Sequence, residues 1–241
     1  EFKGVHVEQP IPRLTYQDAM ERYGSDKPDT RFGMEFFDLG DVLKDSEFKV
    51  FSGTLANGGV IKGITCPGQA ATASRKVVDQ WTEYVKQFGA KGLVTIKMEA
   101  DGPASGIAKF LSDDELNGIA EAADAKEGDM ILIIAADWNT TCEALGRLRL
   151  KLAAEAGMIP EDQFNLLWVT DFPLLERDEE NDRWSAMHHP FTSPKPDDAD
   201  KLESDPGSVR AQAYDIVLNG VEIGGGSIRI HNSDIQARVF K

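Results

Sequence analysis

Residues 213–231 read AYDIVLNGVEIGGGSIRIH. This order predicts a β-strand, an Asn-Gly bend, a second strand, three glycines and an alternating strand that carries Arg229 and His231. Glu222 stands two residues before the glycines, and Arg229 stands three residues after them. Glycines allow a flat ligand to lie against the backbone, while the carboxylate and the guanidinium supply opposite charges along that surface. The stretch therefore favours a site for a ligand that carries an anion and a metal-bound phosphate group.

The same stretch has a purely structural interpretation. In that interpretation Gly224 to Gly226 form a bulge or a loose turn, and Glu222 and Arg229 are strand residues that face solvent. A lone glycine cluster is a weak motif and does not decide between the two. The choice depends on similarity over a longer part of the chain.

Several other blocks precede residues 213–231. They read PRLTYQDAM at 12–20, YGSDKPD at 23–29, WVTDFPL at 168–174 and MHHPFT at 187–192. Together the blocks resemble, in the same order, those of bacterial-type aspartyl-tRNA synthetases, which are class II synthetases. The resemblance covers essentially the whole chain.

The resemblance implies an α+β fold, in which an inserted α/β sandwich-like domain accompanies part of a class II antiparallel sheet. Residues 1–30 are expected to form a catalytic-core segment and linker. Residues 31–160 are expected to form the inserted domain, of the GAD type, which is also similar to a module in the B subunit of tRNA-dependent amidotransferases. Residues 161–241 would then be a second core segment that contains the active-site strands.

Local patterns predict individual elements of the 31–160 region. Residues 48–56 and 60–65 flank Asn57-Gly58-Gly59, which is typical of a β-hairpin. Apolar residues at helical spacing predict a helix over 77–88, closed by Gly89, and a strand over 93–98. Met130 to Ala136 is an apolar run typical of a buried strand.

Three capping boxes mark expected helix starts. Thr15-x-x-Asp18, Ser112-x-x-Glu115 and Thr140-x-x-Glu143 each place a hydroxyl three residues before an acid. Gly24 and Gly157 are expected to end the first and the last of these helices.

Activation of an amino acid joins its carboxylate to the α-phosphate of ATP and expels pyrophosphate. The protein mainly positions the reactants and stabilises charge, usually with Mg²⁺. The resemblance implies that Glu222 contacts ATP and its Mg²⁺, and that Gly224, Gly225 and Gly226 let nucleotide and amino acid approach the sheet. Arg229 matches the family's specificity arginine, and its planar guanidinium can hold the aspartate side chain in a bidentate pair.

His188 and His189 are the next candidates. Adjacent residues on a strand point to opposite faces, which argues against a metal ion bound by both. The resemblance implies that His188 contacts the aspartate substrate and that His189 lies nearby. Asp171 and Asp215 are candidates for supporting acids, although their spacing does not pair them as general acid and base.

The charge of the chain argues against a general nucleic-acid-binding surface. The formal net charge is −15, and residues 161–205 hold thirteen acidic and four basic side chains. The acidic stretches 176–182 and 196–200 are predicted to be exposed, solvated loops. Any tRNA contact is expected to avoid them, because phosphates would be repelled.

Composition predicts a soluble globular protein, and the two cysteines, which belong to no disulfide framework, favour a reducing cytoplasm. It has 241 residues, of which 41% are hydrophobic and 28% charged, and its longest apolar run of seven residues is too short to span a membrane. No export signal is visible, and Cys66 and Cys142 are expected to be free, inert thiols.

The resemblance is incomplete in ways that affect function. The chain begins at Glu1 without methionine and lacks the family's anticodon-binding barrel, its first and second signatures and its C-terminal ATP-binding arginine. We therefore expect a fragment of an aspartate–tRNA ligase that does not catalyse the reaction by itself. For the parent protein the resemblance implies tRNA and aspartate as partners, and a homodimer.

An alternative treats the 31–160 region as a spacer or binding module for tRNA or a partner protein, with no catalysis of its own. A phosphate-binding face requires basic side chains on one surface. The candidates are Arg75, Lys76, Lys86, Lys91, Lys97, Arg147, Arg149 and Lys151.

Overall fold

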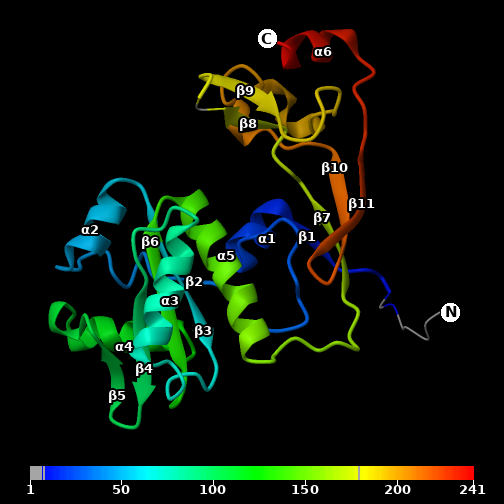
Figure 1. Cartoon of the computed structure of the whole chain (residues 1–241). Helices are drawn as coiled ribbons and strands as arrows, with labels where there is room; N and C mark the ends of the chain where they lie inside the picture. Colours follow the sequence, from blue (N-terminus) through cyan, green and yellow to red (C-terminus); the bar gives the residue numbers. More distant parts are fainter. Residues whose placement is uncertain (1–6, 8, 179) are drawn as a thin grey trace. The chain divides into compact units, whose positions relative to one another are not determined.

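The computed structural model describes residue 7, residues 9–178 and residues 180–241, and Figure 1 labels their elements. The described residues form two compact units. Unit 1 takes its residues from 1–19, 26–31 and 162–241, and unit 2 takes its residues from 20–25 and 32–161. Each unit has its own sheet and its own hydrophobic core, and together they give a mixed α/β architecture with several sheets.

Unit 1 is built on a four-stranded sheet in the order β1-β7-β10-β11. β1 is parallel to β7, and β10 runs antiparallel to both β7 and β11. Val169 and Val217 are fully buried and pack with Phe172, because alternate strand residues share one face. The strands are Arg13–Thr15, Leu166–Thr170, Ala213–Leu218 and Val221–Ser227.

A separate hairpin in unit 1 corrects the prediction of an exposed loop over 176–182. β8 (Leu175–Asp178) pairs antiparallel with β9 (Arg183–Ala186). Arg177 lies opposite Trp184, and its guanidinium carbon is 5.6 Å from the ring centroid, so a cross-strand cation–π contact supports the pairing. Glu179 lies outside the described residues.

The second acidic stretch is also less exposed than predicted. Residues 196–200 belong to a 3₁₀ helix, η2 (Pro196–Lys201), and Asp198 is only 1% exposed. Its carboxylate accepts from the Lys201 Nζ at 2.9 Å and from the Arg210 Nε at 2.6 Å. Those hydrogen bonds keep the pKa of Asp198 well below its usual range, so the charge is buried because it is paired. Unit 1 also contains η3 (Pro206–Ser208) and α6 (Ser233–Val239).

Unit 2 contains a five-stranded antiparallel sheet in the order β2-β3-β6-β4-β5. Its strands are Phe37–Asp38, Val60–Cys66, Met130–Ala136, Val94–Glu99 and Gly102–Ser105. The helices of this unit are α2 (Lys49–Ala56), α3 (Arg75–Lys86), the short 3₁₀ turn η1 (Ala108–Phe110), α4 (Asp113–Ala122) and α5 (Trp138–Glu155).

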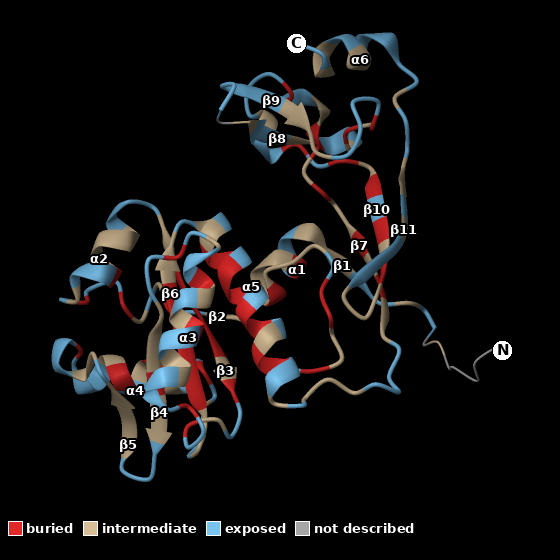
Figure 2. Cartoon of the chain, viewed as in Figure 1, coloured by how far each residue is buried: buried red, intermediate tan, exposed pale blue. Residues whose placement is uncertain are grey.

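The central strand β6 explains why Met130 to Ala136 is apolar without interruption. Leu132 and Ile134 pack in the core cluster that contains residues of α3 and α5. Ile131 and Ile133 pack in the cluster that contains residues of α2 and α4. Helices therefore cover both faces of the sheet, and Figure 2 shows buried positions along β3 and on one side of α5. The predicted buried strand is confirmed.

The predicted hairpin over 48–65 is wrong in its first half. Residues 49–56 form the helix α2, and only 60–66 form a strand. Phe51 is fully buried and touches Phe48 edge-on, so the apolar residues of this stretch follow helical spacing. The Asn57 side chain donates to the carbonyl of Gly53 at 2.7 Å, and Gly58 has a positive φ of 74°. The Asn-Gly pair thus ends a helix instead of joining two strands.

The other predicted helices are present, but one of them begins at a different residue from the one expected. The capping box of Ser112 and Glu115 is present at α4, and the predicted helix over 77–88 is α3. α1 (Tyr16–Tyr23) begins after Thr15, whose Oγ1 accepts from the Asp18 amide at 3.0 Å. α5, however, begins at Trp138, because the Asp137 side chain accepts from the Thr140 amide.

Both cysteines are free and buried, as predicted. Burial raises the pKa of the Cys66 thiol to about 11 and that of the Cys142 thiol to about 12. Thiols with such values are poor nucleophiles near neutral pH.

Candidate active site

A β-bulge orients Glu222. Val217 pairs with Glu222 and Ile216 pairs with Gly224, so Ile223 is an extra residue in β11. With strict alternation, Glu222 would lie on the opposite face from Gly225. The extra residue changes the alternation, and Glu222 shares a face with Val217, Gly225 and Asp215. The three glycines lie inside β11. The sequence had instead predicted that they separate two strands.

The three glycines are not equivalent. A Cβ on Gly225 would lie 2.1 Å from the Oδ1 of Asp215, its cross-strand partner. On the other face, a Cβ on Gly226 would lie 3.0 Å from the Tyr214 hydroxyl oxygen. A Cβ on Gly224 would meet only a methyl group of Ile216, at 3.6 Å. Gly225 is therefore required by the carboxylate of Asp215, whereas the protein itself leaves room at Gly224.

Asp215 is the most perturbed acid on this face. It is 7% exposed, and burial is the main cause of its raised pKa. The charge of Glu222 raises the pKa further, whereas His188 lowers it. The His188 Nε2 lies 3.7 Å from the Asp215 Oδ2, and its ring meets that of Phe172 edge-on at 4.5 Å. Two carboxylates on one face favour a cation between them or beside them.

His188 and His189 follow β9 and are not strand residues, so the premise that they alternate across a sheet is wrong. They still make separate contacts. The Nδ1 of His189 accepts from the Phe191 amide at 3.1 Å, and its ring is tilted against the Phe191 ring at 5.1 Å. That bond leaves the proton of a neutral His189 on Nε2 and fixes the ring orientation.

Arg229 is held through its backbone. It forms an isolated antiparallel bridge with Thr192, and the Ser193 and Ile230 amides donate to the Ile228 and Phe191 carbonyls, each at 2.8 Å. The alternating strand predicted for Arg229 and His231 is thus reduced to this bridge. Alternation from Gly225 places Arg229 on the face of Asp215. Within the part of the chain that the structure describes, its exposed guanidinium has no hydrogen bond or ion pair.

A further polar pair was missed in the sequence. Lys195 forms an ion pair with Asp171, a residue with a positive φ of 61°. The bridges Pro173–Arg210 and Pro194–Ala211 bring the two segments together. No local signal relates two residues so far apart in the chain, so the pairing needs the tertiary structure. Among the described residues, no group of three or more His, Cys, Asp or Glu side chains is placed to hold a metal ion.

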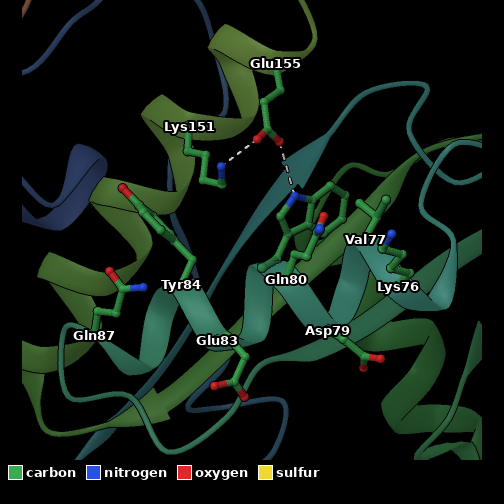
Figure 3. Close-up of a pocket in the computed structure, with 10 residues that line it drawn as sticks. Lys76, Val77, Asp79, Gln80, Glu83, Tyr84, Gln87, Lys151 and Glu155 are labelled. Atoms are coloured by element: carbon green, nitrogen blue, oxygen red, sulfur yellow. Dashed lines mark hydrogen bonds and ion pairs between the residues drawn. The ribbon is translucent and has the colours of Figure 1, made fainter.

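A groove between α3 and α5 of unit 2 shows a different arrangement (Figure 3). Glu155 accepts from the Lys151 ammonium and, at 3.3 Å, from the indole N–H of Trp81. Lys151 also lies 5.2 Å from the centroid of the Tyr84 ring. The two charges that α5 contributes to this groove therefore satisfy one another.

The basic residues considered for tRNA contact in unit 2 do not form one free surface. Arg149 is 1% exposed and donates to the carbonyls of Phe32, Gly33 and Met34, so its candidacy is wrong. Lys86, Arg147 and Lys151 are each paired with a glutamate on the same helix.

Hydropathy identifies no helix among the described residues with the length and apolar character that a membrane span requires.

Comparison with known proteins gives consistent similarities. A family model described as tRNA synthetases class II (D, K and N) matches residues 1–241. The chain is 51% identical over 241 residues to an aspartate–tRNA(Asp/Asn) ligase of Geotalea uraniireducens and 51% identical over 240 residues to that of Bacillus subtilis. It is also 51% identical over 240 residues to an aspartate–tRNA ligase of Halalkalibacterium halodurans. Each alignment covers 100% of this chain and 40% of the relative.

Proposed function

Because the chain belongs to the family of class II tRNA synthetases (D, K and N), we propose that it is part of an aspartate–tRNA ligase, which activates aspartate with ATP and transfers it to tRNA. The chain spans about 40% of the length of the curated relatives it matches. The proposed activity therefore belongs to a larger protein. The names of the relatives support aspartate as the amino acid.

The observation that carries this proposal is the shared face of β10 and β11. The bulge at Ile223 puts Glu222 beside Asp215, and alternation puts Arg229 on the same face. One face thus offers two carboxylates and one guanidinium, with Gly225 and Ser227 between Glu222 and Arg229. This distribution of charge matches a ligand pair composed of an acidic amino acid and a metal-bound nucleotide.

We propose that Arg229 binds the side-chain carboxylate of aspartate. Its backbone is held by the bridge to Thr192, and its guanidinium is free to form a bidentate pair. Asparagine would present amide hydrogens to these donors and leave the charge unmatched, so it is expected to bind poorly. We assign a contact with the aspartate substrate to His188, beside Asp215, and a nearby position to His189.

Glu222 and Asp215 are suited to Mg²⁺ that arrives with ATP. Mg²⁺ is usually bound by one or two carboxylates together with substrate phosphates, which agrees with two acids and no larger ligand group among the described residues. Burial and the nearby Glu222 already raise the pKa of Asp215, and a divalent cation would stabilise both negative charges. Bound Mg²⁺ would neutralise phosphate charge. Gly224, Gly225 and Gly226 would let the nucleotide approach the sheet.

We also propose that the 31–160 region is an inserted GAD-type domain, because unit 2 interrupts the chain of unit 1. A homodimer and tRNA binding are proposed for the whole protein on the basis of its family. Neither depends on the geometry of the aspartate site.

A graft tests the proposed function. These 241 residues would replace the matching region of the Bacillus subtilis relative, and aspartate-dependent ATP–pyrophosphate exchange would be measured. We expect exchange by the graft and none by the 241-residue chain alone. Arg229→Lys in the graft should lower kcat/KM for aspartate about 100-fold or more, because lysine cannot form the bidentate pair. Wild-type rates in the Arg229→Lys graft would show that Arg229 does not bind aspartate.

A further inference from the structure

A cavity of about 630 Å³ lies in unit 2 between α2 and the strands β4 and β6. α2 packs against β3 and β6, whereas α4 packs against β5, so part of the sheet between the two helices borders the cavity. Val94 and Ala135 are half-buried and contribute apolar side chains to its lining, whereas the Ile133 side chain there is only 1% exposed. The volume falls within the range of about 300–1,000 Å³ that is usual for small-molecule sites.

Two glycines on this cavity have no role in the fold that the structure shows. Gly53 lies inside α2, has no positive φ, and a Cβ built on it meets no atom within 4 Å. Gly92, which lies outside the helices, also has no positive φ, and a Cβ built on it meets no atom within 4 Å. By contrast, a Cβ on Gly59 would lie 2.6 Å from the Ala136 carbonyl oxygen, so the fold requires that glycine. Glycine is unfavourable inside a helix, and at Gly53 it widens the cavity without relieving any clash.

The rim of the cavity is cationic. Lys49 and Lys91 are exposed there, and among the described residues neither has an ion pair. The acid on the rim, Asp137, already accepts from the Thr140 amide at 2.9 Å as the cap of α5. With Lys49, Lys91 and Asp137 as the charged residues of its lining, the cavity has a net positive charge, although the chain as a whole has a net charge of −15. The two lysines favour an anionic group at the mouth.

We propose that this cavity binds a small organic anion. Its apolar or aromatic body lies over Val94 and Ala135 and against the backbone of Gly53. Its carboxylate, sulfonate or phosphate group lies at the mouth, near Lys49 and Lys91. The groove of Figure 3 does not share these features, because Asp79, Glu83 and Glu155 line it together with its two lysines. The site is independent of the proposed aspartate site, since it contains none of the residues assigned there.

The test uses the whole 241-residue chain and two matched probes, 1-naphthylacetate and its neutral analogue 1-naphthylacetamide. Amide chemical shifts of ¹⁵N-labelled protein would be followed during each titration. We expect saturable shifts at Gly53 and Gly92 with the acid. The neutral probe should bind about fivefold more weakly, because two exposed ion pairs are lost.

Two variants locate the site. Gly53→Leu fills the cavity and raises helix propensity, so it should keep the fold and lose binding of both probes. The double variant Lys49→Gln and Lys91→Gln should bind the two probes equally. Lys76→Gln, an exposed lysine on the groove of Figure 3, is the matched control and should behave as wild type.

Three results would overturn the proposal. The first is no shift at Gly53 and Gly92 with 1-naphthylacetate at millimolar concentration. The second is equal affinity of the wild-type chain for acid and amide. The third is undiminished binding by Gly53→Leu. Because the lysine double variant tests the role of charge separately, a folding defect in Gly53→Leu would still leave the proposal open to contradiction.

Discussion

The largest sheets of the two units differ in how their charged groups are paired. In unit 2, helices cover both faces, and the buried ions are paired: Arg149 donates to three carbonyls, and Lys62 forms ion pairs with Glu21 and Asp38. In unit 1, Asp215 and Glu222 keep like charges on one face. The comparison teaches that the sheet of unit 2 uses buried charge to stabilise its own structure, whereas the sheet of unit 1 holds like charges together at the site that we propose for a ligand.

The largest expected effect comes from removing a buried cation in unit 2 that donates to backbone carbonyls. Arg149→Met leaves the carbonyls of Phe32, Gly33 and Met34 without this donor, so we expect a loss of about 3–5 kcal/mol in the free energy of unfolding. Urea denaturation measures it. Arg147→Met, on the exposed side of the same helix, is the control and should cost less than about 0.5 kcal/mol. Equal losses would contradict a structural role confined to Arg149.

The next effect tests the crowded part of the unit 1 sheet. Gly225→Ala places a Cβ against the Asp215 carboxylate and should destabilise the chain by about 2–3 kcal/mol. Gly224→Ala meets only a methyl group at 3.6 Å and should be close to neutral. Thermal unfolding of both variants compares them. If Gly224→Ala were the more damaging, the register of β10 and β11 would be wrong.

The third prediction concerns Asp198, a buried charge in unit 1 that is expected to stabilise the fold. Asp198→Asn removes the partner of Arg210 and Lys201 and should cost about 2 kcal/mol at pH 7. The folded state lowers the pKa of Asp198, so its contribution is present above the ordinary aspartate pKa and is lost as the pH falls. Unfolding measured at pH 7 and at pH 3 should show the difference between variant and wild type shrinking. A constant difference would argue against a paired carboxylate.

The smallest expected effect concerns the hydroxyl of Ser112, which caps α4 in unit 2. Ser112→Ala removes the hydroxyl that accepts from the Glu115 amide at 3.2 Å, and should cost about 1 kcal/mol. Thr72→Ala, in the exposed turn before α3, provides a matched hydroxyl that caps no helix. Chemical denaturation of the two variants separates capping from simple loss of a polar group.

The features predicted from the sequence are those decided by neighbours in the chain. β6 could be predicted because seven apolar residues need both faces covered, and α4 because Ser112 and Glu115 satisfy one another three residues apart. α2 was missed because a short apolar stretch before Asn-Gly fits a strand and a helix equally well.

The geometry of the candidate site could not be predicted from any local pattern in the sequence. The side of the sheet on which Glu222 lies depends on one extra residue opposite Ile216 and Val217, and only strand pairing reveals it. The pair of Lys195 and Asp171 likewise depends on two bridges between distant segments. The residue types at the site could be predicted from resemblance, whereas their shared face could not.

The pKa of Asp215 in the Glu222→Gln variant tests the shared face most directly, and NMR titration of the side-chain carboxyl measures it. Glu222 raises the pKa of Asp215 through charge, so its neutralisation should lower that pKa toward the ordinary value. Glu176→Gln, on the β8–β9 hairpin, should leave it unchanged. An unaltered pKa of Asp215 in Glu222→Gln would show that the two carboxylates do not share a face, and would contradict the proposed site.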